Sequence, residues 1–313
     1  MRSAARTDLL LGTIIDITIY GRTSQETLDA AADAAMARAK ELEQIFSATL
    51  EDSELSYVNQ NAANAPVTVS RDMYTVLERS LYFAHLSDGA FDPTLGRLIK
   101  LWGIGTKNAA VPSEDEIQPL IGQKNYEHVV LNETAQTVSF TTDNFELDLG
   151  AIAKGYAADE MKKLLTDDYN ITCGLLNLGG NVITIGERYD GGPWNIGIAD
   201  PQAPQDTSNP ALILEITDET IVTSGNYQRC FTAPDGTLYH HILDGNTGFP
   251  ADTGLASVSI LTDCSMDADA LSTAAFVLGE QKARALLSRL DGIDAVFIDT
   301  QGQITTTSGI DGR

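Results

Sequence analysis

Strand-like and helix-like segments follow one another in blocks along this chain, without the regular strand–helix–strand spacing of a doubly wound sheet. Runs rich in Ile, Val and Thr predict strands, and apolar residues at helical spacing predict helices. The predicted order is a strand at 9–20, a helix at 25–46, an irregular segment at 47–65, a helix from Ser70, a hairpin at 126–147, a helix at 150–165, short glycine-punctuated strands, a helix at 267–289 and a strand pair at 294–307. This order predicts an α+β fold with mixed or antiparallel sheets packed against helices.

Acidic side chains dominate the charge of the chain. The 20 Lys and Arg residues stand against 44 Asp and Glu residues, which leaves a formal net charge of −24. Such a surface repels phosphate backbones and anionic membranes, so we expect no nucleic-acid partner. An anionic ligand would need a local device such as a metal ion, a lysine or backbone N–H groups. No segment predicts a membrane span, and the motifs of P-loop proteins, dinucleotide folds, serine hydrolases and zinc proteases are absent.

The segment LDLGAIAKGY at 147–156 runs from an apolar strand directly into a predicted helix start. A helix start offers free N–H groups and a positive dipole end to an anion. Lys154 lies in the first turn, where a cation is unfavourable unless a phosphate or carboxylate partners it. The alternative is a solvated lysine with Asp148 as the helix cap, and the residues alone leave both interpretations open.

Asp269 and Thr273 are four residues apart in a predicted Ala-rich helix, so they share a face. A carboxylate and a hydroxyl among small residues form half of a hard-oxygen site suited to Mg²⁺. The alternative, which these residues alone favour, is a buried helix whose Thr bonds back to a carbonyl. Asp92, followed by Pro93, is similarly ambiguous: it either presents a carboxylate from a rigid turn or, as the residues favour, caps a helix.

Two of the four histidines are adjacent, at His240 and His241. In a strand their side chains face opposite sides, so only one is expected to serve a given site. An imidazole titrates near neutral pH and can act as a general base. The alternative is a histidine that only makes a hydrogen bond near a hairpin turn.

Taken in order, these segments resemble the ApbE family of FAD:protein FMN transferases. The resemblance covers about residues 9–310, and Ser53-Glu54-Leu55-Ser56 with Asn59 matches an S-E-L-S-x-x-N segment of that family. It implies one α+β domain over 1–313 with flavin bound in a deep cleft. The matching segments are FDPT, LWG, LDLGAIAKGYAAD, NLGGNV, TSGNYQR, HHILDGNTGFPA and ADALSTAAFVLG.

The resemblance also implies roles for individual residues. It places the catalytic residues at His241, the expected base, and at Asp269 and Lys154. It places Mg²⁺ on Asp269, Thr273 and the backbone carbonyl of Ala151. FAD would be contacted at Leu11, Thr49, Ala90, Phe91, Asp92, Asp148, Lys154 and Leu243. Four positions depart from the family pattern: Leu11 replaces a Met, Thr49 replaces a frequent Tyr, Ser272 replaces a frequent acidic residue, and Gly245 after Asp244 replaces a more usual Pro.

The implied activity is Mg²⁺-dependent transfer of FMN from FAD to a Thr or Ser hydroxyl of a target protein, with release of AMP. The expected targets are subunits of sodium-translocating or electron-transfer membrane complexes. Two alternatives stay open, an FAD pyrophosphatase that yields FMN and AMP, and a flavin-binding or scavenging protein. Relatives are commonly periplasmic lipoproteins anchored through an N-terminal Cys; because no Cys lies near the start here, we expect a trimmed periplasmic form or a soluble variant, with the cytoplasm as the alternative.

Overall fold

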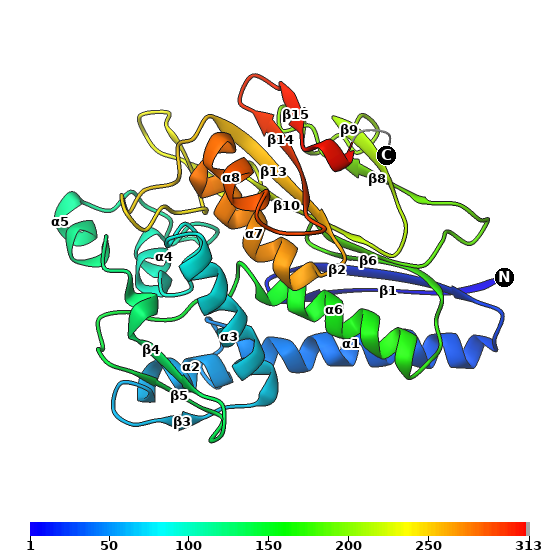
Figure 1. The fold of residues 1–313 in the computed structure, drawn as a ribbon, viewed down its shortest axis with the longest axis horizontal. Helices are drawn as coiled ribbons and strands as arrows, with labels where there is room; N and C mark the ends of the chain where they lie inside the picture. The colour runs from blue at the N-terminus through cyan, green and yellow to red at the C-terminus, as the bar shows by residue number, and fades with distance from the viewer. Residues whose placement is uncertain (311–313) are drawn as a thin grey trace.

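An eight-stranded sheet forms the centre of the computed structural model, which describes residues 1–310 (Figure 1). Every neighbouring pair in this sheet is antiparallel, in the order β1-β2-β6-β7-β10-β13-β14-β15. The strands are β1 (Arg2–Leu10), β2 (Thr13–Gly21), β6 (Cys173–Leu178), β7 (Asn181–Ile185), β10 (Thr220–Gly225), β13 (Leu255–Thr262), β14 (Asp294–Asp299) and β15 (Ile304–Thr306).

Helices cover one face of this sheet and a β-hairpin covers the other. Figure 1 shows α1 and α6 side by side beneath the sheet with α7 beside them, and the β8–β9 hairpin on the opposite side. Each face therefore has its own apolar core, a large one under the helices and a smaller one under the hairpin. The covering elements are α1 (Gln25–Phe46), α6 (Ala153–Asp167), α7 (Ser265–Leu278), α8 (Glu280–Leu287), β8 (Trp194–Ile198) and β9 (Leu212–Ile216).

Small side chains let the long helix α1 pack tightly against the sheet and α6. Ser24 caps its first turn by accepting a hydrogen bond from the Thr27 N–H, as a short hydroxyl side chain does at this position. The inward stripe is mainly alanine, and these side chains are fully buried: Ala31, Ala32, Ala35 and Ala39. Alanine favours helix and occupies little volume, so the backbones of α1, β1 and α6 approach one another closely.

Directly opposed residues form a row across the helix-facing side of the sheet, which we call the central row. It is set by the register of the successive strand pairs, and all its side chains are buried. Its members are Ile15, Leu178, Asn181, Val222, Ile260 and Ala295.

The segment between α1 and α6 folds beside one end of the sheet, at the left of Figure 1. Its three-stranded antiparallel sheet has the order β3-β5-β4. Trp102 is fully buried and donates its Nε1–H to the carbonyl of Gly248 at 2.7 Å, which ties this region to the chain after β12. The elements are α2 (Glu54–Asn61), β3 (Val67–Thr68), α3 (Arg71–Leu86), α4 (Gly96–Trp102), α5 (Glu114–Ile117), β4 (Val129–Asn132), β5 (Thr137–Phe140), and further on β11 (Cys230–Thr232) and β12 (Leu238–His240).

The α+β class predicted from the sequence is confirmed, as are the hairpin within 126–147 and the helix at 25–46. Three local predictions are wrong. The strand at 9–20 is two strands, because Leu11 and Gly12 form a turn with φ of 53° and 68°. The segment 47–65 contains α2, and the helix at 267–289 is interrupted at Gly279, whose φ is 73°. Within residues 1–310 no helix is both long and apolar enough to cross a bilayer.

Candidate functional site

Helices α6 and α7 cross at unusually close range beside the start of α6. A Cβ built on Gly155 would lie 2.1 Å from the carbonyl oxygen of Ser265, so no larger side chain fits at this point. The glycine of the LDLGAIAKG segment therefore serves the crossing of the two helices. This crossing brings Lys154 and Asp269, far apart in sequence, into contact.

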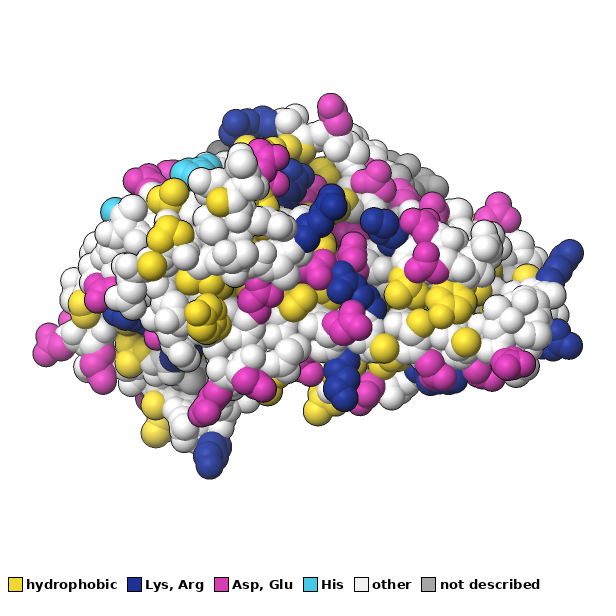
Figure 2. Space-filling model, turned by 90° about the horizontal axis from the view of Figure 1, so that it is seen from below, with side chains coloured by type: hydrophobic (Ala, Val, Ile, Leu, Met, Phe, Trp, Pro, Cys, Tyr) yellow, Lys and Arg dark blue, Asp and Glu magenta, His cyan; other side chains and the backbone are white. Residues whose placement is uncertain are grey.

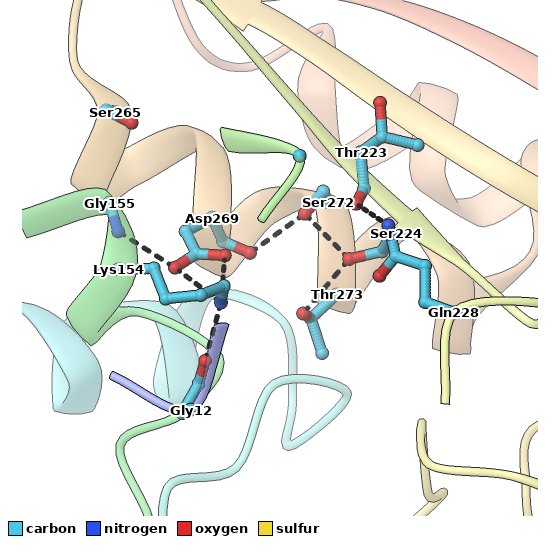
Figure 3. Close-up of polar contacts among 12 residues, drawn as sticks. Gly12, Lys154, Gly155, Thr223, Ser224, Gln228, Ser265, Asp269, Ser272 and Thr273 are labelled. Atoms are coloured by element: carbon cyan, nitrogen blue, oxygen red, sulfur yellow. Dashed lines mark hydrogen bonds and ion pairs between the residues drawn. The ribbon is translucent and has the colours of Figure 1, made fainter. Parts of the chain in front are cut away.

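The carboxylate of Asp269 is buried and fully engaged at this crossing (Figure 3). One oxygen accepts a hydrogen bond from the Gly155 N–H at 3.0 Å. The Lys154 Nζ lies 3.1 Å from each carboxylate oxygen and also donates to the Gly150 carbonyl at 2.7 Å. Lys154 is the second residue of α6, so the cation in the first turn has a carboxylate partner, as one interpretation of the sequence predicted.

Thr273 lies one turn after Asp269 in α7, and its hydroxyl faces Ser224 of β10. Its hydroxyl lies 3.4 Å from that of Ser224, which in turn lies 2.8 Å from the Ser272 hydroxyl (Figure 3). It is Ser272 that bonds back to a helix carbonyl, that of Asp269, at 2.9 Å. The sequence had favoured Thr273 as the residue that bonds to a helix carbonyl, and the structure gives that bond to Ser272. The hydroxyls of Ser272, Ser224 and Thr273 form a short row beside Asp269.

Asp159, the last residue of the LDLGAIAKGYAAD segment, fixes where α7 begins. Its two carboxylate oxygens accept hydrogen bonds from the N–H groups of Ser265 at 2.9 Å and Met266 at 2.8 Å. A carboxylate from a neighbouring helix thus caps the first turn of α7. Burial raises the pKa of Asp159 to about 6, and the two backbone donors offset part of that rise. The sequence reasoning did not assign this residue a role.

The FDPT and LDLG segments lie side by side. The Asp148 N–H donates to the Pro93 carbonyl at 2.8 Å, and the Gly96 N–H donates to the Glu146 carbonyl at 2.9 Å. Asp92 accepts hydrogen bonds from both the N–H and the hydroxyl of Thr94 within its own turn. The cap interpretation of Asp92 is wrong, because α4 begins only at Gly96, with Leu95 before it.

Two carboxylates border this pair of segments in a poorly solvated environment. Burial raises the pKa of Asp92, opposed by the hydrogen bonds from Thr94. Burial also raises the pKa of Asp148, opposed by the Gly150 N–H, which donates to it at 2.8 Å, and then by the positive charges of Lys154 and Arg229. Asp148 does not cap α6 directly, since the helix begins at Ala153.

Asn59 explains the S-E-L-S-x-x-N segment in structural terms. Its amide donates to the carbonyl of Leu147 at 2.9 Å and accepts from the N–H of the same residue at 2.7 Å. Because one side chain satisfies both backbone groups of Leu147, it holds the strand that leads to Asp148. This residue shapes the site from α2 without carrying charge into it.

The two adjacent histidines have different surroundings, and only His240 lies in a strand, as the last residue of β12. His240 is buried and its Nε2 lies 3.1 Å from the Ala251 carbonyl, a structural position. The Nδ1 of His241 lies 3.2 Å from the Arg229 carbonyl, which can only accept, so Nδ1 carries the hydrogen and Nε2 keeps a free lone pair. Burial, and next the Arg229 charge, lower the pKa of His241 to about 4, and Lys154 adds a smaller effect of the same sign.

Arg229 ends the TSGNYQR segment, but the sequence did not identify it as a site residue. Its Nη2 donates to the Gly12 carbonyl at 2.7 Å, which joins the β1–β2 turn to the segment that carries His241. Its charge acts on both Asp148 and His241. Arg229 and Lys154 thus bring two positive charges to the same region of a protein whose visible surface is studded with acidic side chains (Figure 2).

The other predicted contact residues differ in how deeply they are buried. Leu11 lies in the β1–β2 turn, where its N–H donates to Glu43 at 2.8 Å. Ala90, Phe91 and Leu243 are buried, and Thr49 is exposed in the turn after α1, with hydrogen bonds to Ser47. Ala151 lies in the turn just before α6. Among the predicted site residues, Lys154 and Asp269 are in direct contact. The hydrogen bonds of Thr49 go to Ser47 instead. The flavin cleft stays a prediction.

Comparison with known proteins supplies the family. The model of the ApbE family matches residues 11–297 of this chain. The chain belongs to the ApbE family. Similar curated ApbE relatives are an FAD:protein FMN transferase from Treponema pallidum, 39% identical over 99% of this chain and 88% of the relative, and one from Klebsiella pneumoniae, 35% identical over 96% of this chain and 90% of the relative.

Solved ApbE structures have the same fold. The ApbE protein of Thermotoga maritima superposes with a TM-score of 0.89 at 33% identity, covering 98% of each chain. The flavin transferase ApbE of Vibrio cholerae superposes with a TM-score of 0.84 at 28% identity, covering 98% of this chain and 96% of the other. These superpositions cover nearly the whole chain, so the elements that form the crossing of α6 and α7 belong to the shared ApbE fold.

Proposed function

We propose that this chain is an FAD:protein FMN transferase that moves the FMN half of FAD onto a Thr or Ser hydroxyl of an acceptor protein and releases AMP. The observation that carries the proposal is the buried Lys154–Asp269 pair at the start of α6, in a chain of this family. A diphosphate needs local positive charge in a protein of net charge −24. Lys154, Arg229 and the start of α6 supply it in one place.

The acceptor hydroxyl would attack the phosphorus of the FMN half. A new P–O bond forms to the acceptor oxygen, the bond from that phosphorus to the bridging oxygen breaks, and AMP leaves with that oxygen. The hydroxyl proton would pass to the Nε2 lone pair of His241, which is unprotonated near pH 7. Its pKa of about 4 makes it a weaker base than the near-neutral imidazole expected from the sequence. Lys154 and Arg229 would stabilise the negative charge that builds on the leaving phosphate.

We further propose a Mg²⁺ site beside Asp269, where the hydroxyls of Ser272, Thr273 and Ser224 offer hard oxygen atoms. Within residues 1–310 there is no cluster of three or more His, Cys, Asp or Glu side chains that could hold a metal. Asp269, the Thr273 hydroxyl and the Ala151 carbonyl would hold the ion, a set of hard oxygen donors of the kind that Mg²⁺ takes. When bound, it would supply Lewis-acid stabilisation of the diphosphate. The charged carboxylate of Asp269 is already balanced by Lys154, which would shift toward the phosphates.

We expect the acceptors to be subunits of sodium-translocating or electron-transfer membrane complexes and the reaction to take place in the periplasm. The test is to incubate the protein with FAD, Mg²⁺ and such an acceptor subunit, and to look for flavin fluorescence on the acceptor after denaturing electrophoresis. Covalent flavin on the acceptor together with equimolar AMP supports the proposal. Free FMN and AMP with an unlabelled acceptor would establish the pyrophosphatase alternative, and bound FAD without turnover would establish a flavin-binding protein.

A further inference from the structure

Asn181 places an amide in an otherwise apolar row of the main sheet. The other five members of the central row are Ile, Leu, Val and Ala, as expected for a surface that packs under helices. Asn181 is only 2% exposed. Its Nδ2 makes no hydrogen bond to any residue in the described range 1–310. A buried amide donor without a partner is costly, so its presence needs an explanation.

The position of Asn181 points to the candidate site. It opens β7 directly after the Gly179-Gly180 turn, and Gly179 lies against Thr13 in the neighbouring hairpin. Its cross-strand partner on β10 is Val222, and residues two apart in a strand share a face, so Asn181 stands on the same face as Ser224. Ser224 is the residue whose hydroxyl contacts Thr273 and Ser272 of α7.

Asn181 and Ser224 are thus diagonal neighbours, with about 7–8 Å between such positions in an antiparallel pair. Helix α6 packs against β7 on this face, and its first turn carries Lys154. The amide therefore stands beside Ser224, the strand residue that contacts Thr273 and Ser272 of α7.

We infer that Asn181 is a further substrate-binding residue, whose Nδ2–H donates to an oxygen of the bound flavin nucleotide. This inference rests on the proposed function and extends it by one contact made from the sheet below the helices. The same inference accounts for an amide in an apolar row. The unpartnered Nδ2–H destabilises the free protein, and its hydrogen bond to FAD would offset that cost in the complex. Residues kept for binding commonly reduce the stability of the free protein in this way.

The experiment measures two quantities for the same variants, the dissociation constant of FAD in Mg²⁺ by quenching of flavin fluorescence, and the Tm of the FAD-free protein. For Asn181→Leu, which removes the donor and keeps an apolar side chain of similar size, we expect FAD affinity to fall about 10- to 100-fold while Tm is unchanged or higher. For Asn181→Asp, which keeps the shape but aims an anion at the nucleotide, we expect at least the same loss of affinity.

A matched control is Thr184→Val, on the same strand. Thr184 is fully buried, and its hydroxyl donates to the Glu219 carbonyl at 3.0 Å and accepts from the Glu219 N–H at 3.1 Å. This variant is expected to lower Tm and leave FAD affinity unchanged. Asn181→Leu and Asn181→Asp variants that bind FAD within threefold of the wild type would overturn the inference, as would a lowered Tm with unchanged affinity. A wild-type protein that does not bind FAD would contradict the proposed function itself.

Discussion

The carboxylate of Asp269 accepts a hydrogen bond from the backbone N–H of Gly155 at 3.0 Å, across the point where α6 and α7 cross. This contact is possible because glycine lets the two helix backbones meet, and the same meeting places Lys154 against Asp269. The geometry of the candidate site is therefore a direct consequence of how two helices pack.

Gly155→Ala is expected to damage both stability and activity. The added Cβ would lie 2.1 Å from the Ser265 carbonyl oxygen, so we expect the two helices to be pushed apart close to the contact of Lys154 with Asp269. Overpacking of this kind costs about 1–3 kcal/mol of unfolding free energy. Urea denaturation and the flavinylation assay measure the two effects. The matched control is Gly21→Ala, whose Cβ would meet side chains and no backbone atom, the nearest being the end of the Leu28 side chain at 3.1 Å. Equal behaviour of the two variants would contradict the packing argument.

Asp159 should make the stability of the protein depend on pH. Its folded-state pKa is raised from 3.8 to about 6, so the folded protein holds a proton that the unfolded chain has lost between those values. This group therefore destabilises the fold as pH rises through that window, by up to roughly 3 kcal/mol. The difference in unfolding free energy between Asp159→Asn and wild type should shift by this amount, in favour of the variant, from pH 4 to pH 7. A difference that stays flat with pH would refute the assignment.

Lys154→Met is expected to leave the buried Asp269 carboxylate without its cation. Asp269 keeps only the Gly155 N–H, so we expect a loss of roughly 1–3 kcal/mol of stability. The rate of flavin transfer should fall about 100-fold or more, because positive charge at the leaving phosphate is lost. Lys163→Met, on the exposed side of the same helix, serves as the control and should change neither quantity. A Lys154→Met enzyme with wild-type kcat/KM would exclude this lysine from the reaction.

Arg229→Gln should move the pH dependence of the reaction. The positive charge of Arg229 is the second-largest cause that lowers the pKa of His241 to about 4, after burial. Without that charge the pKa rises toward the ordinary value of 6.5, and the acidic limb of the kcat/KM profile moves to higher pH with it. The profile is followed together with an NMR titration of the His241 ring. An unmoved acidic limb would mean either that His241 is not the base or that Arg229 does not act on it.

The sequence predicted the elements whose signal is local. Helix α1 occupies the predicted residues because its alanine stripe is periodic and Ser24 caps it. The turn at Leu11 and Gly12 was missed because it lies inside an unbroken apolar run, and α2 was missed because its short polar sequence buries only Leu55 and Val58. Asp269 and Thr273 were predicted to share a helix face, and they do.

The rest of the site depends on contacts between distant parts of the chain. Nothing in the sequence near Asp159 indicates that its carboxylate caps α7, about a hundred residues later in the chain. The same holds for Arg229, whose guanidinium donates a hydrogen bond to the carbonyl of Gly12, far earlier in the chain. The Asp92 cap was predicted from local preferences, and the strand-like pairing of Leu95 with Glu146 overrides them.

The most direct measurement of the central claim is the mass of an acceptor subunit after incubation with FAD and Mg²⁺, using wild-type protein and the Asp269→Asn variant, each with and without EDTA. The account predicts that the wild type adds one FMN to the acceptor only when Mg²⁺ is free, and that Asp269→Asn adds none within the same time while remaining folded by circular dichroism. Undiminished addition by Asp269→Asn in the presence of EDTA would contradict the account.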